Sequence, residues 1–401
     1  MRTIRQAAAL LSFALLLGGA HPAAAQFYLQ HNLVSDLPGV ADLQDDSLVN
    51  SWGLVASTTS PFWVSNNGTG TSTLYNTSGS TGAAVVKVPL TNLACQCVMV
   101  PGDPTGIVFN GAPLTTGTGF VVTSGGASGP ARFIFVSEDG SISGWNPGVP
   151  PPVPPPPLTS SQAIAVVPAD DANVYKGVAI AGTLKGDFLY ATNFRAGTVD
   201  VFDSKWTKQP AAFADPKIPD GFAPFGIQNI GGIIYVTYAK QDADKHDDVA
   251  RVGNGFVNAF TTDGTLIRRV ASRETLNSPW GLAMAPAGFG KFSGDLLIGN
   301  FGDGKIFAYD PNALRGNGEF KRRGVLHSAN GPPLKIDGLW ALQFGNGAAA
   351  GPKTTLFFTA GPNKESNGLF GSLVVTTPPK DDQGDDNQGN DNQGDDGQGD
   401  D

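Results

Sequence analysis

The sequence predicts an all-β protein that folds as a six-bladed β-propeller, and three observations support this prediction. Glycine and proline are abundant, with 53 and 30 copies among 401 residues, and long helical patterns are nearly absent. Short apolar runs of strand length recur between turn residues along most of the chain. A third pattern, a glycine-led motif, repeats six times, and internal repetition of this kind is typical of propellers.

The repeated motif reads as glycine, any residue, an often β-branched residue, two further residues, an aromatic residue, and then Asn or Asp. Glycine suits the turn, the alternating residues form a half-buried strand, and Asn or Asp opens the next turn. The copies begin at Gly70, Gly140, Gly197, Gly255, Gly304 and, in weakened form, Gly368. Each copy therefore predicts one strand of one blade.

Two further patterns precede each copy and complete the unit. An apolar run predicts a strand buried between stacked sheets. These runs are Phe62–Val64, Phe133–Val136, Phe188–Tyr190, Ile233–Val236, Leu296–Ile298 and Leu356–Phe358. Earlier still, a glycine followed by an aliphatic residue suits the crowded innermost strand. These glycines are Gly53, Gly106, Gly177, Gly226, Gly281 and Gly338.

The sixth unit lacks an outer strand, and residues 27–34 are the candidate to supply it. A strand from the N-terminus would close the ring and protect an exposed sheet edge. We expect Phe27, Leu29 and Leu33 to make its apolar contacts. The second unit carries two interruptions, the Gly/Thr/Ser-rich residues 110–130 and the proline-rich residues 147–157, which predict an elaborated rim.

The two ends of the chain differ from the repeats. Residues 1–25 have a basic start, a short apolar run and small residues before a cleavage point, which predicts a signal peptide and a secreted, periplasmic or extracellular protein. No later segment is apolar enough to cross a membrane, so the mature chain is expected to have no transmembrane segment. Residues 381–401 contain only Asp, Gly, Gln and Asn and predict a disordered acidic tail, leaving residues 26–380 as the propeller domain.

The charge is concentrated in this tail. Its nine Asp residues equal the formal net charge of −9, so the folded body is almost neutral. No basic face remains for nucleic acid, and none is predicted as a partner. Two cysteines, Cys95 and Cys97, are compatible with a local disulfide, with buried thiols or, less specifically, with a metal site.

Candidate ligand residues follow the second strand of successive units. Equivalent loops meet on one face of a propeller, so Glu138 with Asn66, Asn193 and Asn300 could line one mouth of the channel and bind a divalent cation, Ca²⁺ being the first choice. Ordinary turn chemistry is the alternative explanation for these amides. The starts of the innermost strands add Asn50, Asp103 and Asp337 as a second candidate ring.

A charged loop in the fourth unit offers metal ligands at close spacing. Its candidates are Asp242, Asp244, His246 and Asp248, with Asp247 between the last two. The run lacks the glycine and the terminal glutamate of an EF-hand loop. A solvated surface loop is the alternative reading.

Several stretches resemble a family of exported bacterial six-bladed propeller proteins of uncharacterised function. The resemblance rests on residues 32–41, 48–54, 238–248, 278–282 and 336–342, and it spans nearly the whole mature body. The units are also similar in architecture to NHL-type and gluconolactonase-type propellers. That similarity implies a divalent metal held by carboxylates and amides at the central opening.

The sequence leaves three functions open. The first is a monomeric binding or scaffold propeller that recognises carbohydrate, protein or a small molecule at the cell surface or outside the cell. The second is a calcium-dependent, lactonase-like hydrolase with its site at the propeller axis. The third is a structural matrix protein. No nucleophile elbow, zincin motif or P-loop is present to favour an enzyme.

Overall fold

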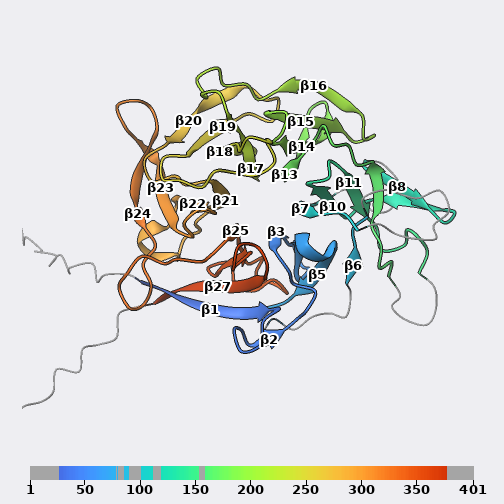
Figure 1. Ribbon diagram of the computed structural model, residues 1–401, viewed down its shortest axis with the longest axis horizontal. Helices are drawn as coiled ribbons and strands as arrows, with labels where there is room; N and C mark the ends of the chain where they lie inside the picture. The colour runs from blue at the N-terminus through green and yellow to red at the C-terminus, as the bar shows by residue number, and fades with distance from the viewer. Residues whose placement is uncertain are drawn as a thin grey trace, which may run out of the picture.

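The computed structural model describes residues 27–77, 79, 85–89, 101–111, 119–152 and 159–376. Six sheets of four or five strands are arranged around one axis, as Figure 1 shows, and the predicted six-bladed propeller is confirmed. The predicted signal peptide, both cysteines and the acidic tail lie outside the described residues and stay predictions. No helix of the described part has the length and apolarity to span a membrane.

Each blade is an antiparallel sheet whose strands follow one another from the axis outward. Blade 1 consists of β3 (Ser51–Val55), β4 (Phe62–Asn66), β5 (Thr71–Tyr75) and β6 (Val86–Lys87). Blade 2 consists of β7 (Pro104–Phe109), β10 (Phe133–Ser137), β11 (Ile142–Trp145) and β12 (Ile164–Val167). Blade 3 consists of β13 (Tyr175–Thr183), β14 (Gly186–Asn193), β15 (Thr198–Asp203) and β16 (Lys208–Ala212). The repeated motifs coincide with the third strands and the apolar runs with the second strands.

The other three blades follow the same plan. Blade 4 consists of β17 (Phe222–Ile230), β18 (Ile233–Lys240), β19 (Gly255–Phe260) and β20 (Leu266–Ser272). Blade 5 consists of β21 (Pro279–Met284), β22 (Leu296–Asn300), β23 (Ile306–Leu314) and β24 (Phe320–Val325). Blade 6 consists of β25 (Leu339–Phe344), β26 (Leu356–Ala360), β27 (Leu369–Thr376), β1 (Phe27–Ser35) and β2 (Leu43–Gln44). Short 3₁₀ turns, η1 (Asn67–Thr69) and η2 (Gly290–Phe292), lie in blades 1 and 5.

The innermost strands touch one another around the ring because glycine stands where they approach most closely. A Cβ at Gly53, Gly106, Gly226 or Gly281 would come within 3.0 Å of backbone atoms of the next blade. A Cβ at Gly177 would lie 3.1 Å from the Phe225 carbonyl oxygen. The small residues predicted at the axis are therefore a packing requirement.

The sixth blade departs from the predicted alignment. Its strand register pairs Leu339 with Ala360 and Leu342 with Phe358, as Ser51 pairs with Asn66 and Leu54 with Val64 in blade 1. The residue equivalent to Gly53 is thus Ala341, whereas Gly338 lies before the strand, in a left-handed turn with φ of 63°. Gly338 and Leu339 therefore mark the turn into the strand. The prediction that Gly338 lies at the axial position of the innermost strand was wrong by three residues.

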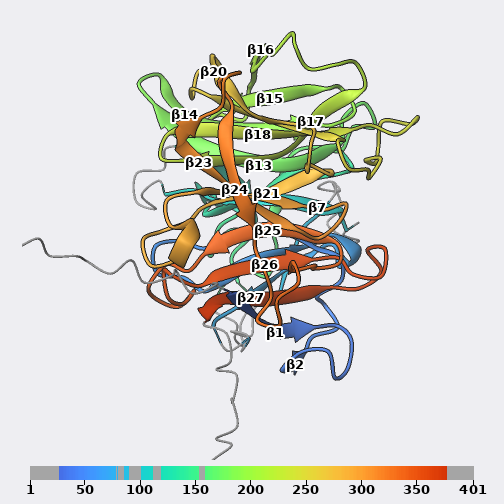
Figure 2. The same ribbon diagram turned by 90° about the vertical axis from the view of Figure 1, so that its left-hand side faces the viewer.

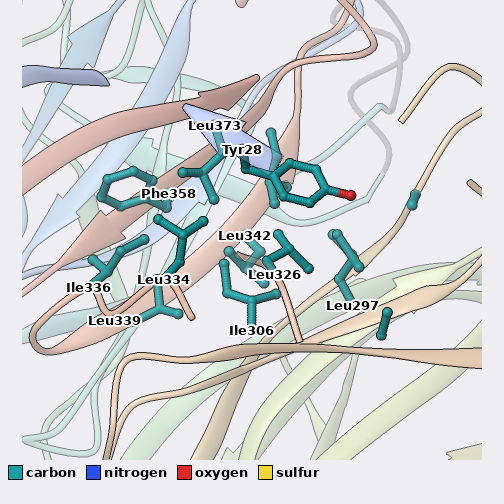
Figure 3. Packing of buried hydrophobic residues seen from close by; sticks show 14 of the residues in the cluster. Tyr28, Leu297, Ile306, Leu326, Leu334, Ile336, Leu339, Leu342, Phe358 and Leu373 are labelled. Atoms are coloured by element: carbon teal, nitrogen blue, oxygen red, sulfur yellow. The ribbon is translucent and has the colours of Figure 1, made fainter. Parts of the chain in front are cut away.

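Strand β1 closes the ring as predicted. It pairs antiparallel with β27 from Phe27–Thr376 to Ser35–Leu369, and both views place the two strands side by side (Figure 2). The buried aromatic residue of β1 is Tyr28, which lies among Leu373, Phe358 and Leu326 (Figure 3). Leu29 was expected to be buried but is 51% exposed, because alternate residues of a strand face opposite sides.

Blade 2 carries the predicted elaboration. A two-stranded sheet of β8 (Val121–Ser124) and β9 (Ala127–Pro130) is inserted between its first two strands. The insertion leans on blade 3, since the Phe120 amide donates to the Ser204 carbonyl oxygen and Trp206 Nε1 donates to the Val121 carbonyl oxygen at 2.8 Å. It lies away from the axis and adds a contact between neighbouring blades.

Substituting the axial glycine of blade 4 should destabilise the ring. We expect Gly226→Ala to lower the free energy of unfolding by about 3 kcal/mol, because the new methyl group overlaps the backbone at Trp280. Gly316→Ala is the control, since nothing lies within 4 Å of a Cβ built there. Urea denaturation of both variants checks the prediction, and equal stabilities would contradict it.

The closing strand provides a second, internally matched test. Tyr28→Ala should lower the free energy of unfolding by about 3–5 kcal/mol, because it empties a packed site between two blades. Leu29→Ala, one residue along the same strand, should change it by less than about 1 kcal/mol because Leu29 is half exposed. Similar losses in both variants would show that β1 does not seal the ring through Tyr28.

Candidate functional site

One face of the ring carries charged residues from several blades. In an antiparallel blade the start of the first strand and the end of the second strand lie at the same edge. Segments entering first strands bring Asn50, Asp103 and Lys176 to this face. Loops after second strands bring Glu138, between β10 and β11, and the charged loop of blade 4, between β18 and β19.

The channel beneath this face is closed by aromatic side chains. The residue before each axial glycine, or before Ala341, has the same register in all six blades. These residues are Trp52, Thr105, Lys176, Phe225, Trp280 and Trp340. Trp52 and Trp340 stack with ring centroids 3.5 Å apart, and Phe225 and Trp280 pack against Trp340. An apolar plug therefore seals the axis below the mouth.

Lys176 is the one cation in that ring of six and its side chain is only 2% exposed. Its ammonium group donates to Glu138 Oε1 and, at 3.2 Å, to Asp247 Oδ1. The rings of Trp52 and Phe194 lie 5.2 Å and 5.9 Å from Nζ. Burial opposes the charge, but the two carboxylates outweigh it and raise the pKa of Lys176, so the side chain stays protonated.

An amide network joins this ion pair to blades 1 and 6. Asn67 Nδ2 donates to Glu138 Oε2 at 2.8 Å, and Asn50 Nδ2 donates to Asn67 Oδ1 at 3.1 Å. The same Asn50 amide donates to Glu365 Oε2 at 2.9 Å. Both oxygens of Glu138 are thus engaged by the protein itself.

The loop that holds Glu365 is strained. Asn363, Lys364 and Glu365 all have positive φ, at 57°, 57° and 66°, although none is glycine. Burial, followed by repulsion from Glu138, raises the pKa of Glu365 to about 7. This carboxyl group therefore titrates near neutral pH at the channel mouth.

A cleft of about 170 Å³ opens beside the ion pair. Its lining residues are Asp103, Glu138, Asp139, Asp171, Asn173, Val174, Arg195 and His246. Partial burial, then repulsion from Asp139 and Glu138, raises the pKa of Asp103. Burial is also the main cause of a raised pKa at Asp139, with a smaller contribution from Glu138. The cleft is therefore rich in carboxylates that repel one another.

The structure does not bring the three candidate asparagines together with Glu138. Asn66, Asn193 and Asn300 are fully buried, and their amides donate within their own blades. The register shows why: Ser137, not Glu138, pairs with the first strand at the position that Asn66 has in blade 1. Glu138 is one residue further on and reaches the mouth, while the asparagines stabilise turns.

The charged loop contributes two of its residues. Asp242 Oδ1 accepts the His246 backbone amide at 2.9 Å, Asp244 is exposed, and Asp248 is partly buried near Lys176. Glu138, His246 and Asp247 each bring one ligand atom within 4.8 Å of the others. Glu138 from the first candidate ring and His246 from the charged loop therefore lie close together at the mouth. From the second candidate ring, Asn50 and Asp103 lie at this mouth, whereas Asp337 Oδ2 accepts the Asn363 amide at 2.9 Å.

Sequence reasoning missed Lys176, Asp139 and Glu365 as site residues. Lys176 had a usable signal, because it precedes an axial glycine where three of the other units place an aromatic residue. Glu365 carried no such signal, since its loop reaches the mouth only through the left-handed turn at residues 363–365.

The chain has relatives among viral proteins. It is 32% identical over 352 residues to the uncharacterised protein R648 of Acanthamoeba polyphaga mimivirus, covering 85% of this chain and 78% of that protein. It is 31% identical to the uncharacterised protein L690 of the same virus, covering 85% and 84%. These relatives are viral, whereas the resemblance in the sequence pointed to bacterial proteins. No protein-family model matches the chain.

Solved propellers are similar in fold only. A virginiamycin B lyase from Staphylococcus aureus has a TM-score of 0.45 and 13% identity, covering 87% of this chain and 99% of that one. A streptogramin B lyase has a TM-score of 0.47 and 10% identity, covering 89% and 100%.

The Glu365 carboxyl group should make stability depend on pH. Its folded-state pKa is raised from 4.5 to about 7, so its contribution is fully present below pH 4.5 and is lost as the pH rises through 7. Glu365→Gln removes this loss, and the variant should exceed the parent by up to about 3 kcal/mol above pH 7. Denaturation between pH 4 and pH 8.5 measures this difference.

The exposed Asp244 provides the control for that series. Asp244→Asn should follow the parent across the whole range because its side chain lies outside the buried network. A Glu365→Gln variant that also follows the parent at every pH would contradict the assignment.

Proposed function

The chain belongs to the family of the mimivirus proteins R648 and L690, and we propose that it is a binding propeller that holds a cationic group of its ligand at the mouth of the channel. The site is the cleft beside Lys176, and the ligand enters from the face that carries the charged loops. The aromatic plug prevents passage through the axis and makes the mouth a closed end, which suits binding.

The observation that carries this proposal is a pair of carboxylates in the cleft, Asp103 and Asp139, without a lysine or arginine partner; His246 lines the same cleft and is a basic neighbour of Asp103. Among the described residues, neither Asp103 nor Asp139 forms an ion pair with a lysine or an arginine. Arg195 lines the same cleft, but its guanidinium donates to the Asp171 backbone carbonyl oxygen. Burial is the main cause of their raised pKa values, and repulsion from neighbouring carboxylates, Glu138 among them, adds to it. A cation in the cleft would favour the charged form of both groups.

The size of the cleft limits what it can hold. About 170 Å³ corresponds to roughly five or six water molecules, so the cleft admits an ion with part of its hydration shell or the end of a longer ligand. The shared chemistry is a positive charge, supplied by Ca²⁺ or by an organic ammonium group on a protein or small molecule. A neutral sugar would gain hydrogen bonds but would leave the repulsion unrelieved.

We place this activity outside the cytoplasm, in the periplasm or the extracellular space. The support is the signal-peptide pattern of residues 1–25. The acidic tail of residues 381–401 would add negative charge to the mature protein and favour cationic partners over long range at low ionic strength.

A metal-dependent hydrolase of the lactonase type is the second candidate. The observation in its favour is the close approach of Glu138, His246 and Asp247. A resident metal at this point would, however, have to share both carboxylates with the ammonium group of Lys176. The binding function needs no such rearrangement.

Cation binding should depend on the carboxylates of Asp103 and Asp139. Isothermal titration of the mature protein with calcium chloride and, separately, with the diamine cadaverine should show saturable binding of at least one of them. Asp139→Asn, and likewise Asp103→Asn, should weaken that binding roughly 10–100-fold, because each removes a charged acceptor. Binding should also fade as the pH drops, since the raised pKa values protonate these groups early.

The control is again Asp244→Asn, which removes a nearby carboxylate outside the cleft and should leave the affinity unchanged. Titration with glucose separates cation binding from sugar binding. If neither cation binds, or if both Asp variants bind as the parent does, the proposed site is wrong.

A further inference from the structure

The axial position of Lys176 has the composition of an ammonium-binding cage. Two carboxylates, Glu138 and Asp247, accept hydrogen bonds from its Nζ, and two aromatic rings, Trp52 and Phe194, lie within 6 Å of it. Carboxylates and aromatic faces are the groups by which proteins recognise ammonium ions. The cage draws on blades 1, 2, 3 and 4, so it forms only when these four consecutive blades are packed together.

The same place offers the geometry of a divalent metal centre. Glu138, His246 and Asp247 approach one another to within 4.8 Å, and a lactonase-like propeller would hold its metal at the central opening. Two of these three ligands are the carboxylates that Lys176 binds. A divalent ion there would face a buried positive charge at contact distance. The residues present therefore do not fit a resident metal.

Lys176 has little freedom to make way for an ion. Its side chain is 2% exposed. In β13, Lys176 lies at a register shift, and its two chain neighbours, Tyr175 and Gly177, pair with Asn193 and Thr192 of β14. The Trp280 indole donates to the Lys176 carbonyl oxygen at 3.0 Å, which ties the same residue to blade 5. Moving the ammonium group away from both carboxylates would leave a buried charge without a partner, which is strongly unfavourable.

We infer that Lys176 supplies, from the chain itself, the cation of the propeller axis: the Glu138–Asp247 cage is an ammonium site filled by Lys176, and it excludes divalent metals. The nearby cleft of Asp103 and Asp139 remains the place for an external cation. The inference stands independently of the proposed function, because it concerns a different pair of carboxylates and a cation that belongs to the protein.

The test truncates the lysine side chain and supplies the deleted atoms as a small amine. Lys176→Ala deletes three methylene groups and the ammonium group, and n-propylammonium restores those atoms. We expect Tm to fall by roughly 5–10 °C in the variant. Propylammonium chloride should recover at least half of the loss, saturably, whereas 1-propanol and sodium chloride at the same concentration should not. Lys208→Ala, which removes a half-exposed lysine paired with Asp200, should show no such recovery.

A second measurement uses the parent protein and remains decisive if Lys176→Ala does not fold. The parent should not bind Mn²⁺ or Zn²⁺ at the Glu138–Asp247 cage. Asp247→Asn identifies binding at the cage, because Asp247 does not line the cleft; this substitution should therefore leave any Mn²⁺ or Zn²⁺ binding by the parent unchanged. Lys176→Met, which keeps the length without the charge, should gain binding at the cage. Metal binding by the parent that is lost in Asp247→Asn, or an absence of amine-specific recovery in a folded Lys176→Ala variant, would overturn the inference. Loss of binding in Asp139→Asn alone concerns the cleft and leaves it intact.

Discussion

Six innermost strands converge on one axis, and their backbones approach so closely that five of the six crossing points are glycine. This close approach sets the diameter of the ring. It also brings the residue before each crossing point into one narrow space, where four aromatic side chains, one threonine and one lysine must be accommodated together. The channel is closed for that reason, and a ligand that approaches along the axis stops at the mouth.

A single buried ammonium group then organises that mouth. A lysine removed from water requires compensating charge, and the compensating carboxylates come from loops of blades 2 and 4. Glu138 is positioned further by Asn67, so blade 1 joins the same network. Loops that are far apart in the sequence are therefore held in place by one requirement, the neutralisation of Lys176.

The remaining carboxylates at the mouth have no comparable compensation. Asp103, Asp139 and Glu365 all have raised pKa values, and burial is the leading cause in each case. Their accumulation is unfavourable for the fold by itself, as is the left-handed backbone at residues 363–365. Such features concentrate at functional sites, and here they coincide with the face of the ring that carries Glu138, Lys176 and the charged loop of blade 4.

The sequence by itself determined the fold of this protein. Periodic turn glycines and alternating strands repeat six times, and each repeat specifies local structure that neighbouring blades then stack. It also predicted Glu138 and the loop of His246 as candidate site residues, and the structure brings the two together. The partners were decided only by the tertiary structure. Asn66, Asn193 and Asn300 have the register position of Ser137 and are buried, whereas Glu138 is one residue further on and reaches the mouth. Asp247, Lys176 and Glu365 meet through ring closure and a strained turn, because contacts between blades depend on geometry that no local pattern encodes.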